Sequence, residues 1–334
     1  MKKIDLHTAS CFEVQRYSPK HQHAWNDFVS TAKNATFLFH RDFMEYLQDH
    51  FEDFSLMVFN DDKLLALMPA NKHGNELHSH QGLSYGGLVL DGYIGFDNVL
   101  KIFREILKYL NQIGIQWLHL KLLPKIYHAL PSDEIDYLLF LVKAEMTRRD
   151  LTQTIALSNK RTIRSSNRKR NLKTAYKNEL TIVESAHFEA FWTNILIPNL
   201  QSTFGVKPVH SLNEITILKN RFKDQIRQFD VYHQSDIVAG VTIFETERVA
   251  HAQYISASPK GRETGALDLA FHYLINEVYA TKAYFDFGIS NENQGRAVNL
   301  GLQSWKESFG AFPIVHDFFR VNTENHHLLN DVLK

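Results

Sequence analysis

Cysteine is almost absent from this chain, which has 334 residues and a single thiol at Cys11. One cysteine cannot build a disulfide framework or a cysteine-rich zinc centre. Cys11 opens an apolar run to Tyr17 that predicts a strand, so we interpret it as a buried thiol rather than a nucleophile. Uncharged apolar stretches of about 18 residues are also missing, and the first ten residues lack the apolar stretch of a signal peptide. These absences predict a cytoplasmic protein without a membrane span.

Several common catalytic motifs are missing as well. The sequence contains no Walker A loop, Rossmann fingerprint, Gly-x-Ser-x-Gly elbow or His-Glu-x-x-His pair. Their absence argues against the commonest NTPases, dehydrogenases, serine hydrolases and metalloproteases. His78 and His80 alternate in a polar, glycine-rich stretch between predicted strands, but no third ligand with metal-site spacing is nearby. We therefore predict no metal.

Net charge is also lacking, since 37 basic residues balance 37 acidic ones. The distribution is uneven, however, because one segment, 160–177, is strongly basic and contains no acidic residue. This segment could contact the phosphates of tRNA or of a cofactor, or it could be a solvated helix between domains. Its basic residues are Lys160, Arg161, Arg164, Arg168, Lys169, Arg170, Lys173 and Lys177.

Periodicity and turn residues predict a similar order of elements in each half of the chain. In the first half we predict a strand at 11–17, helices at 19–32 and 39–51, a hairpin of 54–59 and 64–70, a strand at 76–80, a helix at 96–113, and strands at 117–122 and 135–142. In the second half we predict a strand at 180–184, helices at 187–204 and 211–222, strands at 226–233, 237–245 and 249–257, a loop at 261–265, a helix at 266–280, a strand at 283–287, a helix at 297–309 and a strand at 313–321. The repeated order predicts an α/β protein (α+β, with mixed sheets) that has two mixed sheets with helices on their faces. We place the domains at 1–158 and 159–334.

Three stretches of the second half carry a family resemblance. They are the basic junction 160–175, the segment 256–266 (SASPKGRETGA) between a strand and a helix, and Asp286-Phe287-Gly288 followed by Trp305-Lys306-Glu307-Ser308-Phe309-Gly310. Together with the element order, they resemble the GNAT-fold acyltransferases of the FemABX-like kind over nearly the whole chain. The resemblance implies two tandem GNAT-like (acyl-CoA N-acyltransferase) domains, the first on the acceptor side and the second for donor binding and catalysis.

The donor site implied by the resemblance lies in the 256–266 segment, where GNAT enzymes carry their pyrophosphate loop. Free N–H groups and the positive dipole end at a helix start suit a phosphate. Arg262-x-x-Gly265 fits the opening of the family loop, whereas Leu267 stands where Gly or Ala is expected. FemABX-like enzymes use aminoacyl-tRNA instead, so the expected co-substrate is acyl-CoA or aminoacyl-tRNA. The predicted donor-binding residues are Lys260, Gly261, Arg262, Gly265 and Ala266.

Four residues are candidates for catalysis. Asp286 or Glu292 could remove a proton from an attacking amine. Lys306 could steady a phosphate, a carboxylate or a developing oxyanion, and Tyr254 could act as a general acid. Each has a structural alternative: an anchoring carboxylate for Asp286, a solvated loop for Glu292, a solvent-facing helix lysine for Lys306 and a packed core ring for Tyr254.

Substrate contacts are expected from both halves. The glycine-rich bend at 82–87 is a candidate acceptor site, and strand alternation puts His251 and Gln253 on one face with Ala252 and Tyr254 on the other. The polar stretch 286–296 leaves a strand end, where ligands bind in α/β proteins. The predicted substrate-binding residues are Tyr85, Gly86, Gly87, His251, Gln253, Ser290, Asn291, Arg296 and Trp305.

Three functions follow from these expectations. The first is an acyltransferase that moves an acyl group by direct attack from a thioester to an amine, on an amino sugar or a cell-envelope precursor. The second is FemABX-like transfer of an aminoacyl group from tRNA to a peptidoglycan peptide. The third is a catalytically silent module that binds its ligand in the cleft, in which Lys306→Ala would leave function unchanged.

Overall fold

The computed structural model describes residues 12–47, 50–159 and 165–334. Cys11, which we interpreted as a buried thiol, and the start of the basic segment, 160–164, lie outside the described residues. The chain forms two compact units. Unit 1 comprises Met1–Arg149 and His316–Lys334, and unit 2 comprises Asp150–Val315.

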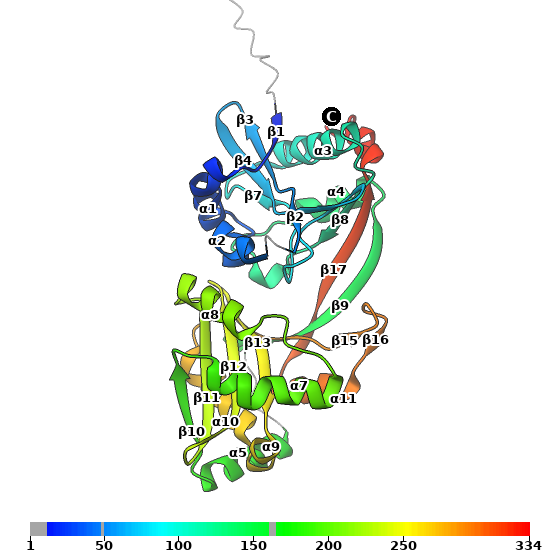
Figure 1. Ribbon diagram of the computed structural model, residues 1–334. Helices are drawn as coiled ribbons and strands as arrows, with labels where there is room; N and C mark the ends of the chain where they lie inside the picture. The colour runs from blue at the N-terminus through cyan, green and yellow to red at the C-terminus, as the bar shows by residue number, and fades with distance from the viewer. Residues whose placement is uncertain (1–11, 48–49, 160–164) are drawn as a thin grey trace, which may run out of the picture. The chain divides into compact units, whose positions relative to one another are not determined.

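Two long strands carry the chain between the units (Figure 1). The chain enters unit 2 within β9 (Glu145–Ala156) and returns to unit 1 within β17 (Phe312–Asn322). The sequence-based boundary lay later, at 158/159, and assigned 316–334 to the second half. The structure differs because β9 was not predicted at all and because β17 pairs with β8 (Trp117–Lys121) of unit 1.

Unit 1 contains two groups of strands. A four-stranded antiparallel sheet has the order β1-β3-β4-β7, and a second group has the order β17-β8-β6-β5-β2. In the second group β6 and β8 are parallel. The strands are β1 Phe12–Arg16, β2 Glu52–Asp53, β3 Leu56–Asn60, β4 Lys63–Met68, β5 Asn71–His73, β6 Glu76–His78 and β7 Val89–Leu90.

The helices of unit 1 confirm the sequence predictions at 19–32 and 96–113 and correct two others. The helix expected at 96–113 is α3, which buries one apolar stripe in the core. The strand expected at 135–142 is wrong, because Ile135, Leu138 and Leu139 are buried at helical spacing in α4. The single helix expected at 39–51 is also wrong, because α2 ends at Met44 and a 3-10 turn follows it at Glu45–Leu47. The helices are α1 Gln22–Thr31, α2 Arg41–Met44, α3 Phe96–Gln112 and α4 Glu134–Leu141, with 3-10 turns at Pro19–His21, Phe37–Phe39, Glu45–Leu47, Lys125–Tyr127 and Thr323–Leu329.

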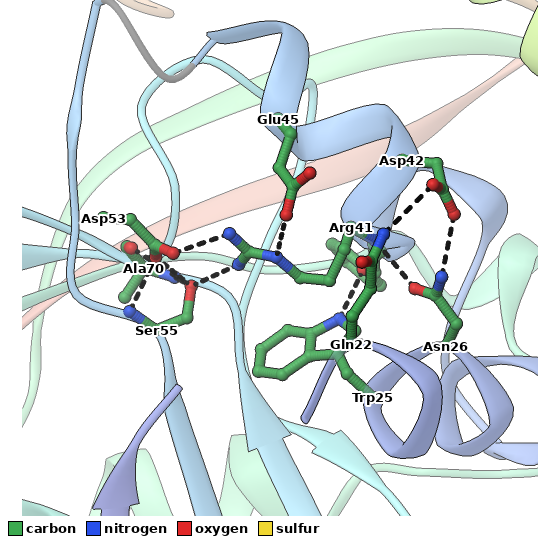
Figure 2. A network of polar contacts seen from close by, with 10 residues as sticks. Gln22, Trp25, Asn26, Arg41, Asp42, Glu45, Asp53, Ser55 and Ala70 are labelled. Carbon is green, nitrogen blue, oxygen red and sulfur yellow. Dashed lines mark hydrogen bonds and ion pairs between the residues drawn. The ribbon is translucent and has the colours of Figure 1, made fainter. Parts of the chain in front are cut away.

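A buried arginine ties α2 to the strands of unit 1 (Figure 2). Arg41 donates to Asp53 Oδ2 at 2.6 Å and to Ser55 Oγ at 3.3 Å. Its guanidinium also lies over the rings of Tyr17 and Trp25, at 3.8 and 5.4 Å. A buried charge needs such partners to offset its desolvation. These contacts assign Arg41 to the structural core of unit 1.

The strands of unit 2 pair in the order β10-β11-β12-β13-β14-β9. These pairs are antiparallel except β13 with β14. The three central strands predicted at 226–257 are confirmed, and Ser211 forms a capping box with Glu214 at the start of the helix predicted at 211–222. The strands are β10 Thr181–Ser185, β11 Ile226–His233, β12 Asp236–Glu245, β13 Val249–Ala257 and β14 Tyr284–Ile289, with a small hairpin of β15 Asn291–Glu292 and β16 Ala297–Val298.

Helices cover both faces of this sheet. One face is apolar: Val241 of β12, Ala252 of β13 and Phe285 of β14 share a core with Ala266 and Phe271 of α10. On the other face, Phe191 of α6 lies against Gly240 of β12. The helices are α5 Ser166–Lys177, α6 Glu189–Phe191, α7 Ile197–Phe204, α8 Leu212–Arg221, α9 Pro259–Thr264, α10 Ala266–Tyr273 and α11 Leu300–Glu307, with π-helical turns at Trp192–Leu196 and Leu274–Val278 and a 3-10 turn at Leu157–Asn159.

Across the parts of the chain that the structure describes, no helix combines the length and apolar character needed to cross a bilayer.

Candidate active site

A row of polar side chains crosses three adjacent strands of the unit 2 sheet, on the face opposite the core formed with α10. Asp286 of β14 pairs in register with Thr154 of β9 on one side and with His251 of β13 on the other. Their neighbours along the strands, among them Phe285 and Ile155, point into the apolar core on the opposite face. Because side chains alternate along a strand, these polar groups share one face.

Asp286 is the centre of this row. The residue is almost fully buried, at 2% exposure. Its Oδ1 accepts hydrogen bonds from the Thr152 hydroxyl, from Thr154 Oγ1 at 3.2 Å and from the Gly288 amide at 3.1 Å. Burial by itself would raise the pKa of Asp286, but the hydrogen bond and charge of His251, together with the Thr152 and Gly288 bonds, outweigh it and hold the pKa at about 2. Asp286 is therefore an ionised acceptor, and it is too weak a base for the role predicted for it.

His251 is oriented by this carboxylate. Its Nδ1 lies 2.9 Å from Asp286 Oδ2. An ionised carboxylate can only accept, so Nδ1 carries the proton, and in the neutral ring Nε2 carries the lone pair. The His251 side chain is 21% exposed, in contrast to 3% for the Asp286 side chain. The arrangement leaves Nε2 as the proton acceptor of the row.

Lys306 approaches the same strand end from α11. It is 3% exposed, which rules out the solvent-facing alternative considered for it. Its Nζ donates to the Gly288 carbonyl at 2.9 Å and to the Ile289 carbonyl at 2.6 Å. Burial lowers the pKa of Lys306 to about 8, and the negative charge of Asp286 acts in the opposite direction. Lys306 thus changes charge close to neutral pH.

Tyr254 lies on the same face as His251, contrary to the alternation expected from the sequence. Thr242 pairs with Tyr254 while Ile243 pairs with Ala252, so Gln253 is an extra residue in a β-bulge. The bulge leaves Ala252 in the apolar core and turns Tyr254 against the ring of Trp192.

The Tyr254 hydroxyl contacts two polar groups of His210. It lies 2.6 Å from His210 Nδ1 and accepts from the His210 amide at 3.1 Å. Burial raises the pKa of Tyr254 to about 12 and lowers that of His210 to about 4. Tyr254 is therefore a protonated phenol beside a neutral imidazole.

The loop predicted at 261–265 is wrong, because most of this segment belongs to the short helix α9. Ser258 caps this helix by accepting from the Gly261 amide at 3.1 Å. A Cβ on Gly261 would lie 2.1 Å from the Val238 carbonyl, and one on Gly265 would lie 2.4 Å from the Asn171 carbonyl. Both glycines therefore allow close packing of the backbone. Ala266, in the same predicted set, is buried in the apolar core.

A cavity of about 180 Å³ lies beside α9 and is lined by Arg262, Leu267 and Trp305. Its wall also holds an internal ion pair, in which Arg168 of the basic segment contacts Asp268 at 3.0 Å. Arg262 donates to the Ala257 carbonyl at 2.7 Å, whereas the predicted partner Lys260 is exposed. Arg168 and Arg262, two basic residues that we expected near a phosphate, therefore already contact other groups of unit 2.

The polar stretch 290–296 forms the small β15–β16 hairpin. Glu292, a candidate base, is exposed, and its Oε1 accepts from Asn299 at 3.0 Å. Asn291 Oδ1 accepts from the Leu151 amide at 2.6 Å, which ties the hairpin to β9. Ser290 is buried and Arg296 is exposed. No described contact joins Glu292 to the polar row.

The glycine-rich bend of unit 1 is a packed structure. Tyr85 is 6% exposed, and its hydroxyl lies 2.9 Å from Thr36 Oγ1. The Gly86 amide donates to the Lys121 carbonyl at 2.6 Å, and Gly87 adopts a left-handed φ of 97°. Tyr85, Gly86 and Gly87, which we predicted to bind the acceptor, thus also have a structural part in unit 1.

Sequence reasoning missed three members of the site: Thr152, Thr154 and His210. The two threonines lie on β9, which had no predicted strand. The available signal was the alternation Thr152-Gln153-Thr154, with β-branched residues two apart in a stretch free of glycine and proline. No local pattern points to His210, because its contact with Tyr254 joins residues far apart in the sequence.

Comparison with known proteins agrees with this architecture. No protein-family model matches the chain, and no curated protein sequence matches it. Among solved structures, FemX matches with a TM-score of 0.64 at 9% identity, over 95% of this chain and 99% of that one. L-PGS from Bacillus licheniformis matches at 0.56 with 14% identity, over 93% and 94%. A tandem GNAT protein from the clavulanic acid pathway matches at 0.52 with 9% identity, over 94% and 99%.

These likenesses confirm the predicted fold. The chain is a mixed α/β protein of two tandem GNAT-like domains, and it shares this fold with FemX.

Proposed function

We propose that this chain transfers an acyl or aminoacyl group from an activated carrier to an amine. The main support is the Asp286–His251 pair, in which a buried carboxylate fixes the tautomer of a partly exposed imidazole. A general base is commonly held in this way, because the carboxylate orients the ring and stabilises it once it is protonated. The fold shared with FemX and a tandem GNAT protein supports the same class of reaction.

The proposed step is a direct attack without a covalent enzyme intermediate. The acceptor nitrogen bonds to the acyl carbon, and the bond from that carbon to the carrier sulfur or oxygen breaks. His251 Nε2 takes the proton that the nitrogen loses. Tyr254, on the same face, is the proposed acid that protonates the leaving thiol or hydroxyl, and the Lys306 ammonium is proposed to stabilise the oxyanion. Asp286 is a positioning residue in this scheme.

Aminoacyl-tRNA is the second candidate donor beside an acyl-CoA. It is favoured by the capped start of α9, where the Ser258 hydroxyl already accepts from the Gly261 amide. It is also favoured by three exposed lysines, Lys169, Lys173 and Lys177, at four-residue spacing along α5. The proposed acceptor is an amine on an amino sugar, a cell-envelope precursor or a peptidoglycan peptide, and the proposed location is cytoplasmic.

A ligand screen followed by turnover tests this function. A donor that binds only the native state raises the melting temperature, so acyl-CoAs, charged tRNA and nucleotide sugars are tested with the purified protein. With the donor found, His251→Ala and Asp286→Asn should each lower kcat by about 100-fold or more. Glu292→Gln is the control and should retain full activity, because Glu292 is exposed and bonded to Asn299.

Two results would contradict the proposal. One is a set of melting curves that no donor shifts. The other is an equal loss of activity in Glu292→Gln, His251→Ala and Asp286→Asn. Turnover would then not depend specifically on the Asp286–His251 pair.

A further inference from the structure

Three potential metal ligands meet on one face of a strand pair in unit 1. Glu76 and His78 are two residues apart on β6, so both side chains leave the same face. His119 of β8 pairs with His78 in the parallel register. The sequence-based argument against a metal was that no third ligand stood nearby, and the β6–β8 pairing provides one from another part of the chain.

The distances between these ligand atoms fit a small tetrahedral cation. Glu76 Oε2 lies 3.4 Å from His78 Nε2 and 3.3 Å from His119 Nε2. All three ligand atoms lie within 4.8 Å of one another. A zinc ion with bonds of about 2.0–2.1 Å separates its ligands by roughly 3.3 Å. Two of the three separations therefore already match a bound ion.

A second observation supports a ligand at this place. A cavity of about 150 Å³ is lined by both histidines, together with Gln81, Lys121 and Thr147. The buried His119 Nε2 has the Glu76 carboxylate as its polar neighbour at 3.3 Å, in a poorly aligned contact. Such a contact satisfies a buried nitrogen only in part. The cavity provides room for the water that completes a three-ligand site.

Neighbouring charges set limits on the cation. Arg320 pairs with His119 across β17 and β8, so its positive charge lies close. Its Nη2 donates to Glu145 Oε2 at 2.5 Å, and its guanidinium lies 4.4 Å from the centre of the Trp117 ring. The Glu145 carboxylate thus offsets much of the Arg320 charge, and Glu76 supplies the negative charge within the ligand set.

We propose that Glu76, His78 and His119 bind one Zn²⁺ or a similar first-row divalent cation, with water as the fourth ligand on the cavity side. Two imidazoles and one carboxylate are a ligand set suited to zinc. The histidine rings are stacked at 4.5 Å with an interplanar angle of 12°, so binding must tilt them until both nitrogens point at the ion. The site lies entirely in unit 1 and does not depend on the proposed transfer reaction.

Cobalt is the direct probe, because tetrahedral Co²⁺ has an intense visible absorption that octahedral Co²⁺ lacks. The full chain, stripped with EDTA, is titrated with Co²⁺ and then with Zn²⁺ in competition. We expect one equivalent of tetrahedral Co²⁺, its displacement by Zn²⁺, and a higher melting temperature with Zn²⁺. Glu76→Gln and His119→Ala should each weaken binding by more than about tenfold, since even outer-shell changes reach that size.

His326→Ala/His327→Ala is the matched control, because this adjacent histidine pair lies outside the site. It should bind Co²⁺ as the parent protein does. The proposal is overturned if the parent shows no tetrahedral absorption, or if the control loses binding while Glu76→Gln keeps it. Should His119→Ala fail to fold, the near-isosteric Glu76→Gln variant decides the matter.

Discussion

Burial affects the ionisable residues of unit 2 in different ways. Asp286 and Asp230 are both almost fully buried on the same sheet. Asp286 accepts from two threonine hydroxyls and an amide and faces His251, so its pKa is held at about 2. Burial raises the pKa of Asp230 to about 6, and hydrogen bonds from Gln228 and Ser185 only partly oppose it. The hydrogen bond and positive charge of His251, which Asp230 lacks, rather than depth, distinguish the carboxylate that stays charged.

The titration of Lys306 should make the transfer activity fall in the alkaline range. Burial lowers its pKa to about 8, so the ammonium is lost as pH rises through that value. If the ammonium stabilises the oxyanion, kcat/KM should fall up to about tenfold per pH unit above pH 8. The measurement is kcat/KM against pH, and Lys306→Arg should flatten this fall because arginine stays charged. Wild-type activity that stays constant through this range would contradict the role.

Asp230 should lower stability at neutral pH. Its folded pKa of about 6 exceeds the ordinary 3.8, so the folded state holds the extra proton between these values. The free energy of unfolding of the wild type therefore falls as pH rises from about 4 to 6, and stays lower above that. Asp230→Asn should remove this loss and gain up to about 3 kcal/mol near pH 7.5, with little difference at pH 4.

Urea denaturation at the two pH values measures the Asp230 effect, and Asp224→Asn serves as the control because Asp224 is exposed. A gain of equal size at both pH values would point to packing instead of charge.

At the scale of elements, one extra residue changes which side chains meet. The bulge at Gln253 leaves Ala252 in the apolar core and turns Tyr254 to the face of His251. A strictly alternating strand would have separated His251 from Tyr254. A bulge of this kind leaves no reliable sequence signal, so alternation alone gave the wrong face for Tyr254.

Helix α5 carries the part of the basic segment that can test tRNA binding. Lys169, Lys173 and Lys177 are exposed, whereas Arg168 pairs with Asp268 and so is a poor probe. Changing the three lysines to glutamine should weaken tRNA binding and make the slope of log K against log salt shallower by up to about 2–3. Binding is measured by titration over a range of salt concentrations.

The charge-matched control for α5 is the triple glutamine variant of Lys20, Lys207 and Lys223, which are exposed elsewhere. Equal weakening by both sets would mean that α5 has no particular part in binding.

At the scale of the whole molecule, the sequence predicted the architecture better than the site. The long amphipathic helix α3 and the strands β11, β12 and β13 have clear periodicity and were predicted correctly. The helix α4 was taken for a strand because its short apolar run fits either period. The strand β9 was missed, and with it Thr152 and Thr154.

The site itself depends on registers between strands that no local pattern encodes. Asp286 and Lys306 could be singled out from their motif, but the role of Asp286 could not. Only the pairing of β13, β14 and β9 reveals that His251 and two threonines surround this carboxylate. Likewise, the partner of Glu76 and His78 becomes visible only in the pairing of β6 with β8.

The two crossings in β9 and β17 also bear on how the chain is made. A ribosome adds every residue of unit 2 before it reaches 316–334. Those late residues supply Val321 and Leu329 to the core of unit 1, and the Thr323 hydroxyl bonds the Ile115 carbonyl. Unit 2 can thus complete its own contacts during synthesis, whereas unit 1 must stay open, with apolar surface uncovered, until translation has passed through the whole insertion.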